Sequence, residues 1–246
     1  MSALADDLLR AFAILTRLPV ADRGRDTAAR CVWAFPLAGG VVGALGAGVL
    51  FAAHQAGLYG MLAAGVALAF QIFVTGALHE DGLADVADGF GGGRCKAEKL
   101  NIMRDSRIGV YGVIALLLVL GLRWNAIAAL GMANAIQALI AAGVLGRVAI
   151  TVLPILLAPA RPSGFGAAIA NPPVAALAGA AVLGLGLAFA LLPPIQCTAI
   201  SAVMLACVGL IAWLANRQIG GYTGDVLGAC EQVSETAILL TLVAMA

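Results

Sequence analysis

The sequence has few charged residues. Only 11% of its 246 residues are Asp, Glu, Lys or Arg, whereas 62% are hydrophobic. Soluble domains carry about 25% charged residues, and a soluble fold could not bury this much apolar surface. An ordinary soluble protein is therefore excluded. We expect an all-α fold, namely a polytopic integral membrane helix bundle.

The sequence also lacks a paired-cysteine motif and a cleavable signal peptide. Its five cysteines form no C-x-x-C pair and lie mostly in or beside apolar runs, so we interpret them as small core residues. Residues 1–33 contain scattered charges where a signal peptide would have an apolar core. We expect this segment to be cytoplasmic or interfacial and to begin with an amphipathic helix.

Long apolar runs, in contrast, are abundant. A helix that spans a bilayer takes about 20 largely apolar residues. We predict six to eight helices in one membrane domain covering residues 1–246, with the final run short for a span. The longer runs are 34–53, 58–78, 125–143, 174–192 and 196–214, and the shorter ones are 109–122, 148–160 and 236–246.

The charges that are present are gathered in two segments. Five of the 14 Lys and Arg residues lie in 1–33 and five more in 79–108, so the positive-inside rule places both segments in the cytoplasm. Residues 79–108 also hold six of the 13 acids, and the next acid is Asp225. If Asp225 faces the same compartment, an even number of crossings separates it from Asp105. We therefore predict that the run 148–160 does not span.

The acidic segment begins with the sequence HEDGLADVADG at residues 79–89. If this segment is helical, Asp81, Asp85 and Asp88 lie within about 60° of one another on the helix. Three such carboxylates repel each other unless a cation lies between them, and Mg²⁺ is usually held by a few carboxylates together with substrate phosphates. We predict a site for one or two Mg²⁺ ions at these three residues. The alternative is a solvated acidic helix end.

Two further blocks in residues 79–108 are predicted to bind phosphate. Glycine backbone can approach an anion closely, so we expect Gly91, Gly92, Gly93 and Arg94 to form a phosphate-binding loop, although a flexible turn is the alternative. In the block 103–109, arginines could clamp phosphate oxygens or serve only as positive-inside anchors. The candidates of this block are Arg104, Asp105, Ser106 and Arg107.

A third cluster, GGYTGD, occupies residues 220–225 within a second predicted active-site segment, 216–235. An acid that lies between apolar runs is a candidate functional residue. We predict Asp225 as a second metal ligand or a general base, with Tyr222 and Thr223 in substrate binding. A helix cap at Asp225 is the alternative.

Three segments together resemble a known enzyme family. TGALHEDGLADVADG at 75–89, IMRDSRIG at 102–109 and GGYTGDVLGA at 220–229 are similar to the adenosylcobinamide-GDP ribazoletransferases, also called cobalamin 5′-phosphate synthases. The likeness extends over nearly the whole chain. It implies a bacterial inner-membrane enzyme with a cytoplasmic active site that joins adenosylcobinamide-GDP to α-ribazole or its 5′-phosphate and releases GMP.

The resemblance also implies roles and partners. Glu80 or Asp225 would accept the proton of the attacking hydroxyl, and Arg104, Arg107 and Arg94 would stabilise the departing GMP phosphate. The partners implied are the two substrates, Mg²⁺ and the lipid bilayer, with no nucleic acid, and a homo-oligomer is left open. Membrane CDP-alcohol phosphotransferases use similarly spaced aspartates, but their Ala-Arg and further Asp pair are absent here. A cation transporter would be expected to place its carboxylates near the bilayer midplane.

Overall fold

The computed structural model describes residues 3–21 and 28–246. Its described residues form eleven α-helices and one 3₁₀-helix, and no strand is found among them. The helices are α1 (Ala3–Leu15), η1 (Ala28–Ala34), α2 (Phe35–Gln55), α3 (Met61–Thr75), α4 (Leu78–Gly92), α5 (Lys96–Ile102), α6 (Val110–Ala129), α7 (Met132–Leu156), α8 (Phe165–Ala168), α9 (Val174–Leu191), α10 (Pro194–Ile219) and α11 (Gly224–Ala244). This confirms the all-α prediction.

Six helical segments are long and apolar enough to cross a membrane: η1 with α2, then α6, α7, α9, α10 and α11. A seventh would be α3 with α4, which meet at a bend of 88°. The expected count of six to eight is confirmed, and the chain is a multi-pass membrane protein.

Four charged residues of the N-terminal segment, at positions 22, 23, 25 and 26, lie outside the described residues.

The positions of several spans differ from the sequence prediction. The run 148–160 was predicted not to span, but its residues up to 156 form the C-terminal part of the 25-residue helix α7. The run 125–143 is instead divided by a turn at Leu130 and Gly131 between α6 and α7. The final helix has 21 residues, so the expectation that it is short was wrong. Four spanning-length helices therefore separate Asp105 from Asp225, and the number is even.

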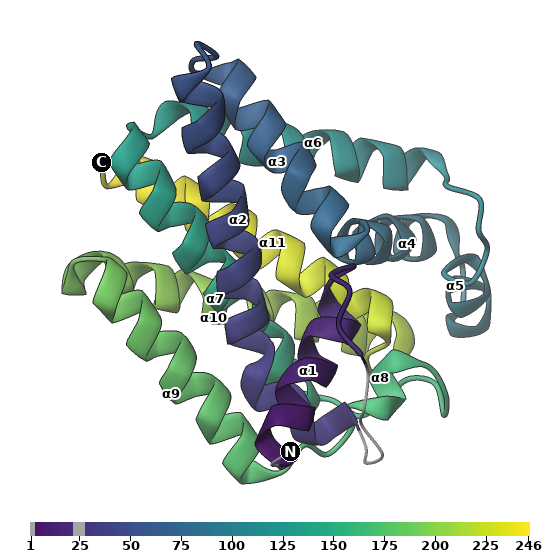
Figure 1. Cartoon of the computed structure of the whole chain (residues 1–246). Coiled ribbons are helices and arrows are strands. Elements are labelled where there is room, and N and C mark those ends of the chain that lie inside the picture. Colours follow the sequence, from purple (N-terminus) through teal and green to yellow (C-terminus); the bar gives the residue numbers. More distant parts are fainter. Residues whose placement is uncertain (1–2, 22–27) are drawn as a thin grey trace.

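Helix α11 runs through the middle of the bundle and packs against α4, α6, α7 and α10 (Figure 1). Helices α2 and α7 make the most extensive helix pair, and small residues let their backbones approach closely. A Cβ atom on Gly39 would lie 2.0 Å from the carbonyl oxygen of Gly143. The contact between α2 and α7 is thus built on closely packed glycines, which suits a fold that packs inside lipid.

The bend between α3 and α4 positions the acidic motif. Gly76 and Ala77 both adopt left-handed backbone conformations, with φ of 64° and 57°. Two such residues in succession end α3 and start α4 in a new direction. As a result α4 lies nearly perpendicular to α3, with its acids directed along the end of the bundle where α6 and α11 begin.

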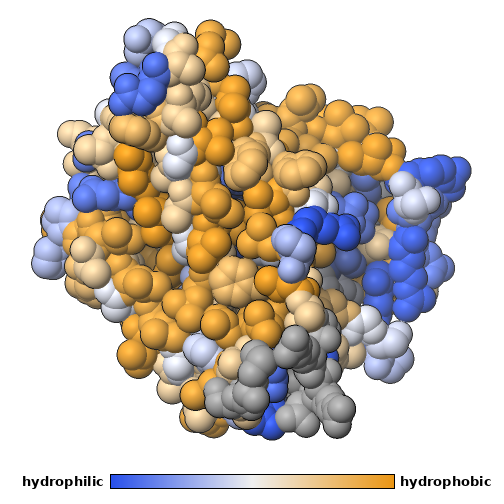
Figure 2. Space-filling model, in the orientation of Figure 1, coloured by the Kyte–Doolittle hydropathy of each residue, from blue (hydrophilic) through white to orange (hydrophobic). Residues whose placement is uncertain are grey.

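The surface divides into apolar and polar regions. Figure 2 shows hydrophobic residues over most of one face, and hydrophilic residues gathered on the right, where Figure 1 shows α5. Helix α5 has the sequence KAEKLNI and contains no buried residue. The polar end of the molecule is therefore the end that carries α4 and α5, as the clustering of charges in residues 79–108 predicted.

Candidate active site

The predicted acidic helix is present as α4. Asp81, Asp85 and Asp88 all lie on this helix, which confirms the helical interpretation of their spacing. Their environments differ: Asp81 is exposed, Asp85 is half-buried and Asp88 is only 8% exposed. The three carboxylates therefore have different opportunities to bind a ligand.

The carboxylate of Asp88 is already engaged by protein groups. One oxygen accepts a hydrogen bond of 2.7 Å from the amide of Gly109, and the other accepts one of 2.9 Å from the amide of Gly112. These amides belong to the first turn of α6, where unpaired N–H groups and the helix dipole favour a negative charge. Asp88 thus caps α6 from another helix.

Asp225 takes a place beside the other two aspartates. Gly82 contacts the start of α11 so closely that a Cβ atom there would lie 2.8 Å from the carbonyl oxygen of Asp225. The negative charges of Asp81 and Asp225 both act on Asp85. The structure therefore brings Asp225 together with Asp81 and Asp85, although Asp225 lies at least 140 positions further along the sequence.

A basic residue faces this acidic group from the loop after α7. Arg161 lies with its Nη1 atom 3.5 Å from Asp225 Oδ2, and its Nη2 atom donates a 2.8 Å hydrogen bond to the carbonyl oxygen of Leu100. Burial lowers the pKa of the Arg161 guanidinium, while the Asp225 charge opposes this effect. Sequence reasoning did not assign Arg161 a role, although its position beside Asp225 places it at the site.

Three pockets meet at Asp81. The first, the arginine pocket, has a volume of about 420 Å³, and its lining includes Glu80, Asp81, Asp85, Arg104, Ser106 and Arg107. The second, the apolar pocket, has about 110 Å³ and includes Leu15, Ile150, Phe165 and Leu227 with Asp81 and Asp225. The third, the N-terminal pocket, has about 480 Å³ and lies between α1 and the α3–α4 bend. Asp81 is common to all three.

The loop between α5 and α6 supplies the cations of the arginine pocket. Arg104 and Arg107 both line it, as do Asp105 and Ser106. Arg107 Nη2 donates a 2.7 Å hydrogen bond to Asp105 Oδ2, and this pairing lowers the pKa of Asp105 to about 2. All four predicted residues of this block are thus placed beside the acids of α4.

The predicted phosphate-binding glycine loop has a different structure. Gly91 and Gly92 belong to the last turn of α4, and only Gly93 leaves the helix. Gly91 lies against the ring of Tyr111, where a Cβ atom would come within 2.8 Å. Arg94 donates its backbone N–H to Glu98. Gly91 and Gly92 are therefore helical and not part of a loop, and none of the residues Gly91, Gly92, Gly93 and Arg94 lines the three pockets at Asp81.

Tyr222 and Thr223 occupy structural positions. The Tyr222 ring is fully buried, and its hydroxyl donates a 3.0 Å hydrogen bond to the carbonyl oxygen of Gly166. Thr223 is the N-cap of α11, since its hydroxyl accepts a hydrogen bond from the amide of Val226. The cap is therefore Thr223, and the interpretation of Asp225 as the cap is wrong. The structure places neither Tyr222 nor Thr223 in the lining of the three pockets.

Glu80 belongs to a buried polar network inside the bundle. Its Oε1 atom accepts a 3.0 Å hydrogen bond from Gln232 and lies 3.6 Å from Arg123, while its Oε2 atom has no hydrogen-bond partner. Because Glu80 also lines the arginine pocket, it connects the network with the site. The remaining members are Arg147, Glu231 and Glu235, each at most 2% exposed.

The network is held by short ion pairs. Arg147 contacts Glu231 at 2.5 Å and Glu235 at 2.9 Å, and Arg123 contacts Glu235 at 2.7 Å. Buried charges persist when they are paired and hydrogen-bonded. The sequence analysis did not predict this network. The signal that could have revealed it is that Arg123 and Arg147 interrupt apolar runs, because charged residues inside a span pair with one another or mark a site.

The acids around Asp81 do not form a complete metal site by themselves, but they can supply some of the ligands of a bound ion. Within 3–21 and 28–246, no three His, Cys, Asp or Glu side chains are grouped as a metal site. Mg²⁺, however, is often bound through one or two carboxylates, with water and phosphate oxygens as further ligands. Asp81, Asp85 and Asp225 offer suitable oxygens, whereas both oxygens of Asp88 already accept hydrogen bonds.

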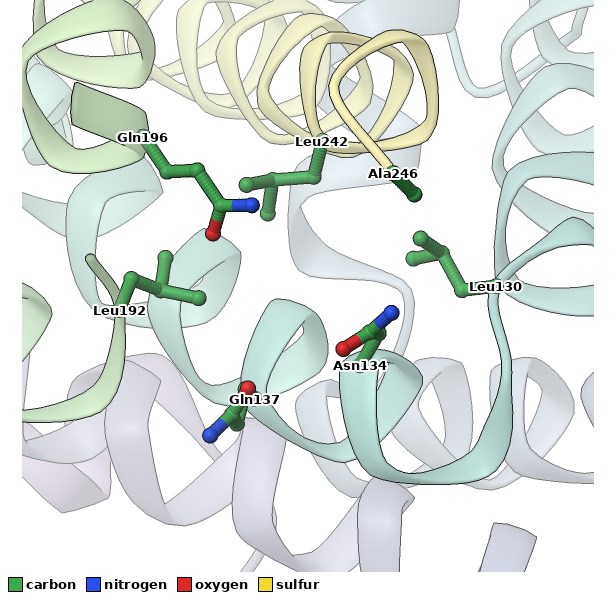
Figure 3. Close-up of a pocket in the computed structure, with 7 residues that line it drawn as sticks. All are labelled: Leu130, Asn134, Gln137, Leu192, Gln196, Leu242 and Ala246. Carbon is green, nitrogen blue, oxygen red and sulfur yellow. The ribbon is translucent and has the colours of Figure 1, made fainter.

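A fourth pocket lies at the other end of the bundle, near the turns that follow α6 and α9 (Figure 3). It has a volume of only about 20 Å³, and no acidic or basic side chain lines it. Its lining residues are Leu130, Asn134, Gln137, Leu192, Gln196, Leu242 and Ala246. We therefore place the candidate active site at Asp81 and not here.

Comparison with known proteins identifies relatives that match nearly the whole chain. A protein of Bradyrhizobium diazoefficiens named adenosylcobinamide-GDP ribazoletransferase is 48% identical over 244 residues, covering 97% of this chain and 93% of the relative. Proteins of the same name from Mesorhizobium japonicum and Azorhizobium caulinodans are 44% and 42% identical and cover 96% and 97% of this chain, and 92% and 96% of the relatives. No solved structure matches.

The sequence pattern of cobalamin-5-phosphate synthase matches residues 7–243, which is nearly the whole chain. The matched residues include α4, the loop 103–109 between α5 and α6 (the arginine loop) and the start of α11, so the site described above lies within the shared region. The chain belongs to the cobalamin-5-phosphate synthase family of transferases, which act in cobalamin synthesis.

Proposed function

We propose that this enzyme joins adenosylcobinamide-GDP to α-ribazole or α-ribazole 5′-phosphate and releases GMP in a reaction that requires Mg²⁺. The observation that carries the proposal is the meeting of Asp81, Asp85 and Asp225 with Arg104, Arg107 and Arg161 at one end of the bundle. Phosphoryl transfer depends mainly on positioning and charge neutralisation. A site with carboxylates beside arginines supplies both.

In the proposed reaction, a ribazole hydroxyl attacks the phosphorus next to the cobinamide arm. A new oxygen–phosphorus bond forms as the bond to the GMP oxygen breaks, and GMP leaves. Arg104 and Arg107 line the arginine pocket and can hold the phosphate oxygens of the donor. Their fixed positive charges stabilise the charge that develops on the departing phosphate.

The proton of the hydroxyl must pass to a base. Two carboxylates are in place: Glu80, whose Oε2 atom is unpaired, and Asp225, which lines the apolar pocket. A general base must come within hydrogen-bond reach of the proton that it removes. Both candidates border a pocket that also contains Asp81, so both stay in the proposal.

We propose that Asp81 and Asp85 hold the Mg²⁺, with Asp225 as a further ligand when Glu80 is the base. When bound, the ion neutralises charge on the diphosphate and can polarise the reacting phosphorus. Asp88, which was also a predicted ligand, acts in this proposal by fixing the start of α6 and hence the arginine loop. The protein itself orients the two substrates.

The positive charges of residues 79–108 favour a site on the cytoplasmic side of the bacterial inner membrane. To test the function, purified protein in detergent is incubated with adenosylcobinamide-GDP and α-ribazole 5′-phosphate, and the products are identified by mass. Adenosylcobalamin 5′-phosphate and GMP in equal amounts are expected. Transfer to an alcohol from a CDP-linked donor, or cation flux in liposomes without any transfer, would contradict the proposal.

A further inference from the structure

The apolar pocket differs in chemistry from the arginine pocket, although Asp81 borders both. Its wall consists of Leu15, Leu78, Ile150, Phe165 and Leu227, and these residues come from five different elements. Such a pocket is assembled only in the folded bundle. A mostly apolar cavity with a few polar groups at one end is typical of a site for a small molecule.

A buried histidine indicates that this pocket receives a ligand. His79 lines the apolar pocket and is only 2% exposed, yet neither of its ring nitrogens has a hydrogen-bond partner. The nearest acid, Glu231, lies 4.0 Å from Nδ1, which is too far for a hydrogen bond. A buried polar group without a partner costs free energy, and a ligand atom that bonds to the imidazole would remove that cost.

We infer that the apolar pocket binds the flat aromatic base of the acceptor nucleoside. This inference rests on the proposed function. In that function the donor diphosphate needs cations, and these line the arginine pocket. The acceptor needs a place for an apolar ring and a route for its hydroxyl to the acids, and the apolar pocket provides both, because Asp81 and Asp225 are part of its wall.

The two pockets then give each substrate its own side of α4. The donor diphosphate lies with Arg104 and Arg107, and the acceptor base lies with Ile150 and Phe165. The hydroxyl and the phosphorus meet near Asp81, the residue that both pockets share. Selectivity among acceptor bases is accordingly set by the apolar pocket, while affinity for the donor is set elsewhere.

The test compares two acceptors that differ by two methyl groups: α-ribazole, with a dimethylbenzimidazole base, and the same nucleoside with unsubstituted benzimidazole. Phe165→Ala enlarges the pocket. This variant is expected to raise the KM for α-ribazole roughly tenfold, since lost contacts in an apolar pocket have effects of this size. Its preference for the methylated base should fall. Its KM for adenosylcobinamide-GDP should change less than about twofold.

A second variant alters the pocket wall from α11. A Cβ atom on Gly228 would lie 3.2 Å from the Cα and carbonyl oxygen of His79, so Gly228→Ala must shift the backbone of α4 slightly where it borders the pocket. It is expected to lower kcat/KM more for α-ribazole than for the unsubstituted acceptor. The matched control is Ile14→Ala, which truncates an apolar residue of the N-terminal pocket and should leave the ratio of the two acceptors unchanged.

The outcomes separate the inference from the proposed function. If wild-type protein transfers but Phe165→Ala and Gly228→Ala leave the acceptor ratio unchanged, the inference is overturned and the proposed function stands. A rise in the KM for the donor in place of the acceptor would also overturn it, because the pocket would then hold part of the donor. If the wild type transfers neither acceptor, the proposed function fails and the inference fails with it.

Discussion

The carboxylate of Asp88 accepts a hydrogen bond of 2.7 Å from the backbone amide of Gly109. This contact joins the acidic helix α4 to the end of the arginine loop, where α6 begins. Neither glycine that Asp88 contacts can carry a side chain without a clash: Cβ atoms on Gly109 and Gly112 would lie 2.4 and 2.5 Å from its oxygens. The acids and the arginines of the site therefore keep a fixed relation to each other.

Replacement of Asp88 is expected to reduce stability. Asp88→Ala removes a buried charged acceptor from two amides, and hydrogen bonds to charged groups are worth about 1.5–3 kcal/mol each. We expect the free energy of unfolding to fall by roughly 3 kcal/mol, measured by thermal or denaturant unfolding in detergent. Unchanged stability together with complete loss of turnover would contradict the capping role and make Asp88 a direct ligand.

Asp85→Ala is the matched variant on the same helix. Asp85 is half-buried between other acids, so its removal relieves repulsion and should not destabilise the fold. Its turnover is expected to fall at least about 100-fold, as when a group that stabilises the transition state is lost. Near wild-type turnover of Asp85→Ala in a monodisperse sample would refute its assignment to the metal.

The buried network should be sensitive to loss of a single partner. Glu235 bonds to both Arg123 and Arg147, and removal of one member of a buried ion pair costs about 3–5 kcal/mol. We expect Glu235→Ala to unfold well below the melting temperature of the wild type. The control is Asp105→Ala, which breaks an exposed pair with Arg107 and should leave the melting temperature close to that of the wild type.

The close contact of α2 and α7 can be tested with two alanine variants on the same helix. Gly39→Ala would place a Cβ atom 2.0 Å from the backbone of Gly143, whereas a Cβ atom on Gly48 would meet nothing within 4 Å. We expect Gly39→Ala to destabilise the protein strongly and Gly48→Ala to be neutral or stabilising, because alanine has the higher helix propensity. Equal melting temperatures would show that the two helices do not pack as described.

The pH dependence of catalysis should not originate from Asp105. Its pKa is lowered to about 2 by hydrogen bonds from Arg107. A carboxyl group whose pKa is lowered in the folded state favours folding above its unfolded value of about 3.9, and this contribution is lost as the pH falls through about 2. Asp105 is therefore ionised throughout the range in which activity is measured.

Accordingly, Asp105→Asn should lower kcat/KM, because Arg107 loses the partner that orients it. The midpoint of the acid limb of the pH–rate profile between pH 5 and 9 should remain where the wild type has it. A shifted midpoint in this variant would show that Asp105 itself titrates during catalysis.

The sequence predicted the parts of the site that depend on local periodicity. The spacing of Asp81, Asp85 and Asp88 indicated one helical face, and α4 confirms the helix. This spacing could not reveal that Asp88 caps α6, because the amides that donate hydrogen bonds to its carboxylate belong to residues 21 and 24 positions away. The contact of Gly91 with the Tyr111 ring, 20 positions along the chain, could not be predicted from local spacing either.

The ends of the membrane-spanning helices were harder to predict than the helical membrane class of the fold. The turn at Leu130 and Gly131 interrupts an apolar run without any charge, so hydropathy alone could not divide that run correctly. The pairing of Arg123 and Arg147 with Glu235 likewise spans 88 or more residues of sequence. The resemblance to known transferases identified the family, which the comparisons confirm, and the structure adds the spatial relations within the site.

The most direct test of the central claim is the release of GMP from adenosylcobinamide-GDP by purified protein, with and without α-ribazole 5′-phosphate and with and without Mg²⁺. The proposed transfer predicts GMP only when acceptor and metal are both present. Release that is independent of the acceptor would indicate hydrolysis, and full release in the presence of a chelator would contradict the role assigned to Asp81, Asp85 and Asp225.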